Sequence, residues 1–345
     1  MARDASNLLW GNFFEFSYNN YTEKMPDWFN YHNNNELQYQ PYLRWDQKLW
    51  EDLTKQIAAA GGNAVILHLG DGIKYDSHPE IAVEGAWTPG ELKAEIKRLK
   101  AMGIDLYPML NFSSAHDLWL GKYHRMVSTP EYYAVCADLI TEVSEIFDRP
   151  KYFSLGYDEE TFGHQSWYEY AVVRQSDLWW RDFLWFVDQV EKQGSRNWIW
   201  SDKIWDHNDE FLARMPESVI QSNWYYPKNF DLDVDLERAK ANGIEIREPA
   251  EGVERTKTTP LRAFLELERG GFDQIPAGSI DVSPDNFAGN VRFAQQHLPC
   301  SRILGFMQTY WRPMLEEFRG FHELGMAKFA EGVRAYDPDG WANNV

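Results

Sequence analysis

The sequence contains few cysteines, no long apolar run and too few cations to balance its acids. Its two cysteines, Cys136 and Cys300, lie far apart without metal-ligand spacing, which excludes a disulfide framework and leaves at most one bridge. No stretch is apolar enough to span a bilayer, and Met1–Asn7 has neither the basic region nor the apolar core of a signal peptide. We expect a periplasmic or extracellular protein whose signal peptide has been removed, with a cytoplasmic location as the alternative.

The charge balance and the missing motifs narrow the range of ligands. With 34 Lys and Arg against 53 Asp and Glu, the formal net charge is −19. A chain this acidic repels phosphate backbones and anionic membrane surfaces, so we expect neither nucleic acid nor membrane as a partner. No Gly-rich phosphate turn follows a strand, and no His-x-His or His-x₃-His pair offers metal ligands. The sequence therefore predicts no cofactor and favours a neutral substrate, while the oligomeric state stays open.

Aromatic residues, in contrast, are abundant at 16% of the chain, with 16 Trp, 18 Tyr and 20 Phe. This is more Trp than packing alone usually demands, because a buried indole N–H needs a partner. Trp-rich clefts suit sugar rings, whose C–H faces lie flat on aromatic planes. An aromatic-rich core is the alternative explanation for any single Trp.

Strand-like and helix-like segments alternate along the chain, without internal repeats or low-complexity linkers. The clearest helix is capped by Thr88, has Pro89 at its first position and Glu91 as the capping-box acid, and ends at Gly103. The predicted strands are Leu8–Phe16, Asn63–Leu69, Ile104–Asn111, Tyr152–Tyr157, Trp198–Ser201, Val219–Trp224, Ile244–Glu248 and Ile303–Gln308.

Eight β/α units in a chain of this length predict an α/β fold, a single (β/α)₈ TIM barrel that spans residues 1–345 as one catalytic domain. A doubly wound open sheet is the alternative topology. Long loops are predicted after strands one and seven, at Ser17–Leu43 and Pro249–Ser283. Such loops would close one end of a cleft and favour cleavage at the end of a substrate chain.

Active groups of a barrel enzyme lie at the carboxyl ends of its strands. In this sequence those positions are rich in carboxyls, imidazoles and indoles, where random surface loops would carry more Lys and Ser. The candidates are Glu15, His68, Asp71, Asn111, His116, Tyr157, Asp158, Glu159, Glu160, Trp200, Asp202, Trp224, Glu248, Tyr310 and Trp311.

The run SLGYDEE, from Ser154 to Glu160, is the most informative feature. An apolar strand ends at Gly156, and three acids follow where the chain turns, so that Asp158 and Glu159 can both reach one cleft. Crowded acids have separated pKa values, which gives a protonated acid beside an ionised partner. That division of labour is what a glycosidase needs. The structural alternative is a solvated acidic strand end or a helix cap.

Two segments resemble a known family. Residues Ala86 to His116, AWTPGELKAEIKRLKAMGIDLYPMLNFSSAH, look like the second helix and third strand of the family 20 glycoside hydrolases, the β-N-acetylhexosaminidases. The segment Ser154–Glu159 occupies the place of the family's His-x-Gly-Gly-Asp-Glu on strand four. The resemblance covers about half of the barrel and follows the family in order and spacing more than in identity. It implies a hydrolase that acts on a neutral or N-acetylated sugar.

The resemblance also implies roles for single residues. Glu159 would be the general acid/base, and Asp158 would orient the substrate's 2-acetamido group, which is the internal nucleophile of that family. Trp224 and Trp311 match strand-end residues that line the family's sugar pocket, and Trp200 on strand five is a candidate for its floor.

The sequence departs from the family at several positions. Ser154 replaces the family's His and Tyr157 its second Gly, so that Tyr157 could fill the place of an acetamido group. The family's Pro-Glu-Ile-Asp reads Pro-Met-Leu-Asn up to Asn111, and His116 is displaced by one residue. On predicted strand seven, Arg247 and Glu248 stand where the family has a Tyr.

Three other functions stay open at this stage. A retaining glycosidase would pair Glu159 or Glu160 with Glu248 as nucleophile, at a carboxyl separation of about 5 Å. A metal-dependent isomerase or hydrolase would draw its ligands from His68, Asp71, His116, Asp202 and Glu248. A non-catalytic carbohydrate-binding barrel would keep the Trp-lined cleft without a poised acid.

Overall fold

A computed structural model describes residues 7–24, 36–246 and 256–341, which form a parallel eight-stranded sheet. The strand order is β6-β5-β4-β3-β2-β1-β8-β7. Parallel bridges from Gln221 to Gln274 and from Trp224 to Ala277 join the two outer strands and close the ring. The strands are β1 Leu9–Glu15, β2 Ala64–His68, β3 Asp105–Met109, β4 Tyr152–Gly156, β5 Arg196–Trp200, β6 Ile220–Ser222, β7 Ala277–Ser279 and β8 Gly305–Thr309.

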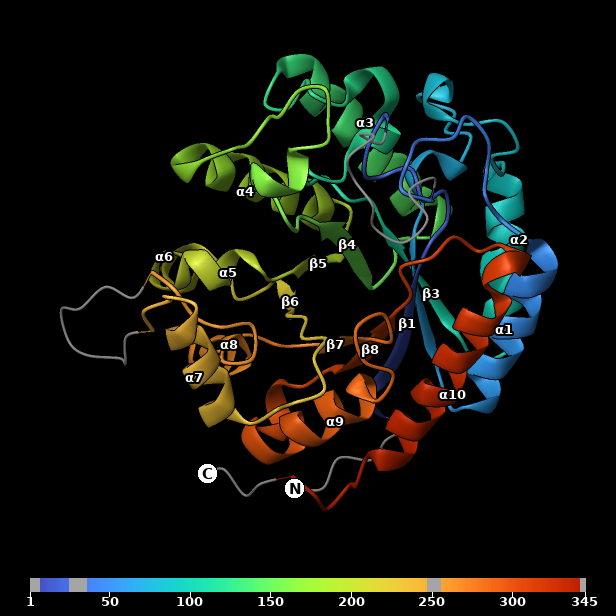
Figure 1. Cartoon of the computed structure of the whole chain (residues 1–345). Helices are drawn as coiled ribbons and strands as arrows, with labels where there is room; N and C mark the ends of the chain where they lie inside the picture. The colour runs from blue at the N-terminus through green and yellow to red at the C-terminus, as the bar shows by residue number, and fades with distance from the viewer. Residues whose placement is uncertain (1–6, 25–35, 247–255, 342–345) are drawn as a thin grey trace.

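The helices between the strands surround this ring (Figure 1). They are α1 Gln47–Ala59, α2 Pro89–Ala101, α3 Pro130–Ile146, α4 Ser176–Lys192, α5 Lys203–Asp206, α6 Asn208–Arg214, α7 Leu232–Ala241, α8 Ala263–Arg269, α9 Asn286–His297 and α10 Arg319–Ala335. The predicted capping box of α2 is confirmed, because Thr88 accepts the Glu91 N–H at 3.2 Å and Glu91 accepts the Thr88 N–H at 2.7 Å. The fold is thus the predicted (β/α)₈ barrel.

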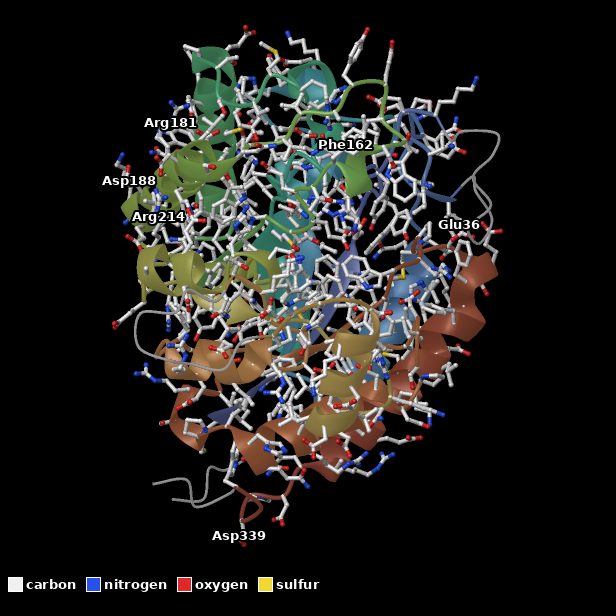
Figure 2. The ribbon with its side chains drawn as sticks, turned by 60° about the vertical axis from the view of Figure 1, so that its left-hand side comes forward. Glu36, Phe162, Arg181, Asp188, Arg214 and Asp339 are labelled. Carbon is white, nitrogen blue, oxygen red and sulfur yellow. The ribbon has the colours of Figure 1, made fainter. Side chains whose placement is uncertain are left out.

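Two layers of apolar side chains hold the barrel together. Inside the ring, Phe13, Ile66, Met109 and Met307 fill the space between the strands. A second layer lies between the sheet and the helices, where Trp50, Trp119, Trp179, Trp180 and many aliphatic residues are fully buried. Charged side chains such as Arg181, Asp188 and Arg214 lie on the outer surface (Figure 2). In the described ranges, no helix is long and apolar enough to cross a membrane.

The prediction for strand seven was wrong. Residues 244–246 form no strand, because the Ile244 N–H bonds to the Ala239 carbonyl and, after Gly243 at φ 70°, ends helix α7. Residues 247–255, which include Arg247 and Glu248, lie outside the described residues. The true β7 is the three-residue strand Ala277–Ser279, and the long connection therefore precedes it and contains α8.

Close packing explains why β7 lacks the bulky residues typical of a buried strand. A Cβ on Gly278 would lie 2.5 Å from Asn286 Oδ1 and 3.0 Å from Asn290 Nδ2, both on helix α9. Only glycine allows the helix to approach the strand this closely. The strand is consequently too short and too small to show a hydrophobic pattern.

Candidate active site

The turn after β4 presents the two predicted catalytic acids on a strained backbone. Gly156, Tyr157 and Glu159 have left-handed φ angles of 66°, 73° and 56°. A Cβ on Gly156 would lie 2.2 Å from the Asn111 side chain, so only glycine fits there. Left-handed backbone costs other residues about 1–2 kcal/mol each. Neighbouring groups must therefore hold this turn in place.

Side chains from both neighbouring strands supply that support. Asn111, just beyond β3, accepts the Tyr157 N–H at 3.0 Å and donates its Nδ2–H to Asp158 Oδ1 at 2.8 Å. Asp202, just beyond β5, accepts the Glu159 N–H at 2.9 Å. The turn is thereby fixed on both sides, with Asp158 and Glu159 directed towards one space.

The two acids converge on the imidazole of His116. Its Nε2 lies 3.5 Å from Asp158 Oδ2 and 3.2 Å from Glu159 Oε2. Burial by itself would lower the pKa of His116, but the carboxylates of Asp158, Glu159 and Glu15 outweigh burial and raise it to about 9. His116 is therefore a cation at neutral pH that lies between two acids.

The pKa values of the two acids move in opposite directions. Burial raises the pKa of Asp158 against the opposing charge of His116. Burial acts in the same sense on Glu159, but its hydrogen bond and charge interaction with His116 outweigh burial and lower the pKa. The Glu159 side chain is also more exposed, at 27% against 11% for Asp158. The geometry therefore favours the ionised form of Glu159 more strongly than that of Asp158.

Two further acids are buried at the same end of the barrel. Glu15, the last residue of β1, accepts hydrogen bonds from Asn20 and, at 3.0 Å, from the Tyr21 hydroxyl. Burial raises its pKa to about 7. Burial and the neighbouring Asp158 raise the pKa of Asp202 to about 8. The site therefore carries less negative charge at neutral pH than its four carboxyls suggest.

Aromatic side chains from β5, β6 and β8 wall this end of the barrel. Trp200, at the end of β5, lies 5.5 Å from Phe13 and 6.2 Å from Trp311, measured between ring centroids. Beyond β6, Trp224 stacks on Tyr226 at 5.1 Å. The structure thus brings the three predicted Trp residues to the same end of the barrel as the acids.

His68 and Asp71 lie at the same end, in supporting positions. His68 ends β2, and burial lowers its pKa to about 3, so that it is neutral beside the edge of Trp119. Asp71 accepts a hydrogen bond from Asn19 Nδ2 at 2.9 Å, and burial raises its pKa to about 7. Asp71 thus anchors the loop that follows β1.

Two predicted residues point away from the acids. Tyr157 packs its ring on Trp179 and Phe183 of α4, with centroids 5.2 Å away in each case. Tyr310 stacks on Phe14 at 4.7 Å and donates its hydroxyl hydrogen to Asn12 Oδ1 at 2.7 Å. Both rings belong to the layer between sheet and helices, so neither fills the space beside Asp158.

The third acid of the run is part of a buried ion pair. Glu160 accepts hydrogen bonds from Arg174 Nε at 2.8 Å and Nη2 at 2.6 Å, and also from the Ser114 N–H at 3.0 Å. Its carboxylate is fully engaged by these donors. Glu160 therefore ties the loop after β4 to the loop after β3.

Sequence reasoning missed two polar groups at this end. His164, on the loop after β4, has its Nε2 3.4 Å from Glu159 Oε1. Asp281, two residues beyond the true β7, accepts the Ser279 hydroxyl at 2.7 Å and lies 3.2 Å from Arg312 Nη1. His164 follows no strand end directly, whereas placing β7 correctly would have identified Asp281.

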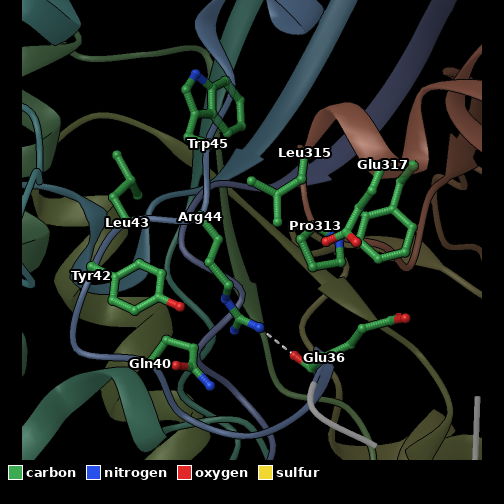
Figure 3. A pocket seen from close by; sticks show the side chains of 10 residues that line it. Glu36, Gln40, Tyr42, Leu43, Arg44, Trp45, Pro313, Leu315 and Glu317 are labelled. Carbon is green, nitrogen blue, oxygen red and sulfur yellow. Dashed lines mark hydrogen bonds between the residues drawn. The ribbon is translucent and has the colours of Figure 1, made fainter. Parts of the chain in front are cut away.

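A hollow of about 510 Å³ lies beside this end, between the loop after β1 and the segment after β8 (Figure 3). Tyr42, Trp45 and Leu315 are among its walls. Arg44 crosses it and donates to the backbone oxygens of Tyr18, at 2.7 Å, and Glu36. None of the clustered acids Glu15, Asp158, Glu159 or Asp202 lines this hollow, so it is separate from the candidate site.

Solved structures of other proteins share this fold, although their sequences differ widely from this one. No family model and no curated protein matches the sequence. Solved structures that share the fold include a family 20 exo-β-N-acetylglucosaminidase from Vibrio harveyi, solved with N-acetylglucosamine, at 13% identity and a TM-score of 0.56. They also include a Bacteroides fragilis β-N-acetylhexosaminidase, at 13% identity and a TM-score of 0.57, and a Flavobacterium johnsoniae chitobiase, at 16% and 0.57.

These likenesses extend over most of this chain but only part of the others. The matches cover 93%, 93% and 87% of this chain, and 54%, 65% and 47% of the Vibrio, Bacteroides and Flavobacterium chains respectively. The chain thus spans about half to two thirds of the length of these three structures. At such low identity the likeness concerns the arrangement of the backbone. The chain therefore has the barrel fold of the family 20 glycoside hydrolases, as the resemblance in residues 86–116 predicts.

Proposed function

We propose that this protein is a glycoside hydrolase whose single barrel domain removes a sugar that bears a 2-acetamido group. The observation that supports this most strongly is the convergence of Asp158 and Glu159 on His116, within 3.5 Å, among the aromatic side chains Trp200, Trp224 and Trp311. Adjacent carboxyls with opposite pKa shifts suit acid/base work on a glycosidic bond. The shared fold with β-N-acetylhexosaminidases points to the same chemistry.

In this proposal Glu159 is the general acid/base. Its proton passes to the glycosidic oxygen as the bond to the anomeric carbon breaks, and the acetamido oxygen attacks that carbon. Asp158 accepts the acetamido N–H and stabilises the positive charge that develops there. The Glu159 carboxylate then takes a proton from the water that opens the cyclic intermediate. The protonated His116 favours this carboxylate form of Glu159, 3.2 Å away.

The acid role needs a proton on Glu159 before the glycosidic bond breaks. Burial raises the pKa of Asp158, whereas His116 lowers that of Glu159, so the free site opposes this protonation. Substrate binding must therefore raise the pKa of Glu159 as well as position the sugar.

The retaining mechanism with Glu248 stays a prediction, although the strand on which it was placed is not β7. That mechanism needs a nucleophile on strand seven, and β7 is Ala277–Ser279, while Glu248 lies outside the described residues. The acid that does follow β7 is Asp281, whose carboxylate lies 3.2 Å from Arg312.

A metal-dependent enzyme is the second candidate function, because ligand atoms of His116, Asp158 and Glu159 lie within 4.8 Å of one another. This group shares only His116 with the ligands predicted from sequence. A cation here would have to displace the proton that His116 holds at neutral pH.

Replacing Glu159 with glutamine tests the proposed function. The wild type should hydrolyse nitrophenyl glycosides that carry a 2-acetamido group and not those with a 2-hydroxyl. Glu159→Gln should lose about 10²–10⁴-fold in kcat and keep its affinity for N-acetylglucosamine, measured by calorimetry. Glu169→Gln, an exposed acid on the same loop, is the matched control and should stay fully active.

Three results would count against this assignment. Undiminished turnover by Glu159→Gln would remove Glu159 from the catalytic role. Equal rates on both classes of glycoside would remove the acetamido group from the mechanism. Sugar binding without any hydrolysis by the wild type would favour the non-catalytic carbohydrate-binding barrel.

A further inference from the structure

The turn that carries Asp158 and Glu159 is bracketed by two residues that contact the same side chain. The ring centroid of Tyr157, directly before the acids, lies 4.6 Å from the guanidinium carbon of Arg174. Glu160, directly after them, accepts hydrogen bonds from the Nε of Arg174 at 2.8 Å, from its Nη2 at 2.6 Å and from its backbone N–H at 3.0 Å. One arginine therefore contacts both ends of the acid pair.

The same guanidinium connects the turn to two further parts of the barrel. Arg174 Nη2 also donates to the carbonyl oxygen of Phe112 at 2.7 Å. Phe112 follows Asn111, whose side-chain amide donates to Asp158 at 2.8 Å. Arg174 Nη1 lies 3.5 Å from Asp182 Oδ2 on helix α4. The turn is thus joined through one side chain to the loop after β3 and to the helix behind it.

Burial makes this arrangement restrictive. The side chains of Arg174 and Asp182 are fully buried, and that of Glu160 is 2% exposed. Moving any of these charges would leave another without its partner and away from water, which is strongly unfavourable. A guanidinium is planar and presents its donors in a fixed fork, so it also sets the orientation of the carboxylate it binds. The left-handed residues Tyr157 and Glu159 need such restraint, because strained backbone persists only where its surroundings hold it.

Stability alone does not account for a buried ion pair at this place. Apolar side chains of similar volume often stabilise a protein as well as a buried Arg–Glu pair does. Such a pair nevertheless fixes directions that apolar side chains leave free. Helix α2 offers a comparison, because Arg98 donates to Glu95 in the same bidentate way, at 2.8 and 2.6 Å. That pair joins residues three apart on one helix, and the Arg98 side chain is 30% exposed.

We propose that Arg174 is a positioning residue for the two acids. By holding Tyr157 and Glu160, it keeps the carboxyls of Asp158 and Glu159 directed at the bond that is to be cleaved. Arg174 acts from behind the turn and touches no substrate. The inference rests on the proposed function, because it concerns the rate at which these acids act.

Replacing Arg174 with lysine tests this inference, because lysine keeps the charge and loses the planar fork. In Arg174→Lys, kcat on a nitrophenyl N-acetylglucosaminide should fall about 10–100-fold, since displacing reacting groups by about 1 Å costs about 10²-fold. KM should stay almost unchanged, because the aromatic walls of the site are untouched. Arg98→Lys is the matched control: it removes the same bidentate pair on α2 and should keep the wild-type kcat.

A loss of stability is separated from a loss of positioning by measuring kcat per folded molecule. Circular dichroism gives the melting temperature of each variant, and the kinetics are then measured well below it. A substitution that only destabilises the barrel lowers activity in proportion to the unfolded fraction, and would leave kcat per folded molecule at the wild-type value. That result for Arg174→Lys would overturn the inference and leave the proposed function standing.

A double variant decides the question if Arg174→Lys does not fold. Glu160→Gln combined with Arg174→Met removes both charges of the pair together, which proteins tolerate better than the loss of one. The glutamine oxygen can still accept the Ser114 N–H, which bonds to Glu160 at 3.0 Å. This variant should fold and show the same loss in kcat, and a wild-type kcat would overturn the inference. A wild type without activity on the glycoside would instead overturn the proposed function.

Discussion

Replacing Asp202 with alanine removes the acceptor that holds the Glu159 backbone in its left-handed conformation. The Glu159 N–H donates to Asp202 Oδ2 at 2.9 Å, and Glu159 has a φ of 56°. Leaving a buried N–H without a partner costs about 1–3 kcal/mol, and relaxing the backbone would recover about 1–2 kcal/mol. Relaxation is therefore favoured, and it would move the Glu159 carboxyl away from the reacting bond.

The expected loss follows from these energies. A positioning energy of about 1–3 kcal/mol corresponds to a loss in kcat of about 5–150-fold, with little change in KM. Steady-state kinetics on a nitrophenyl N-acetylglucosaminide gives both constants, and thermal melting followed by circular dichroism shows whether the barrel stays folded.

Asp202→Asn is the matched variant, because its amide oxygen can still accept the Glu159 N–H. Burial raises the pKa of Asp202 to about 8, so the wild-type side chain is mostly neutral below that pH and asparagine reproduces its charge. Activity near that of the wild type is expected at about pH 6, with divergence only above pH 8, where the wild type gains a negative charge. An alanine variant as active as the wild type, or an asparagine variant as poor as alanine, would refute the positioning role.

Two further predictions concern protons and metals. Burial raises the pKa of Glu15 from 4.5 to about 7, so its contribution to stability is complete below pH 4.5 and is lost as pH rises through 7. Glu15→Gln should abolish this loss of about 3 kcal/mol in the free energy of unfolding. Urea unfolding of both proteins at low and high pH measures the loss, and an identical pH dependence in the two proteins would contradict the prediction. Dialysis against a chelator should leave activity unchanged, because His116 is protonated at neutral pH; activity lost and then restored by zinc would support a metal held by His116, Asp158 and Glu159.

The fold could be predicted wherever local signals agreed with packing. The capping box at Thr88 and the apolar strands β1 to β6 and β8 combine both kinds of signal. At β7 the local signals and the packing disagree. The alternating residues Ile244–Ile246 look like a strand but follow the end of a helix. The true strand contains Gly278, where a side chain has no room because Asn286 and Asn290 lie against it. A close approach between distant segments leaves no periodic pattern for sequence analysis to find.

The candidate site was predictable to the level of strand ends but not of side-chain direction. Tyr310 and Trp311 are neighbours on one strand end, and they point to opposite sides, Tyr310 into the helix layer and Trp311 towards Phe13. Alternation along a strand requires that at most one of them face the mouth. The left-handed turn at Tyr157 and Glu159 breaks this alternation, which is why Asp158 and Glu159 can share His116.

The direction in which the acids share their proton depends on geometry that sequence does not contain. Crowding alone predicts separated pKa values, whereas the closer approach of His116 lowers the pKa of Glu159 and burial raises that of Asp158. A hydroxyl of the substrate can donate or accept a hydrogen bond, so it binds either form of Asp158. An amide N–H can only donate, and it binds a carboxylate more strongly than a neutral carboxyl, so it favours the ionised form of Asp158. In the proposed reaction, a 2-acetamido group would thereby favour a proton on Glu159 over one on Asp158, whereas a 2-hydroxyl group would not.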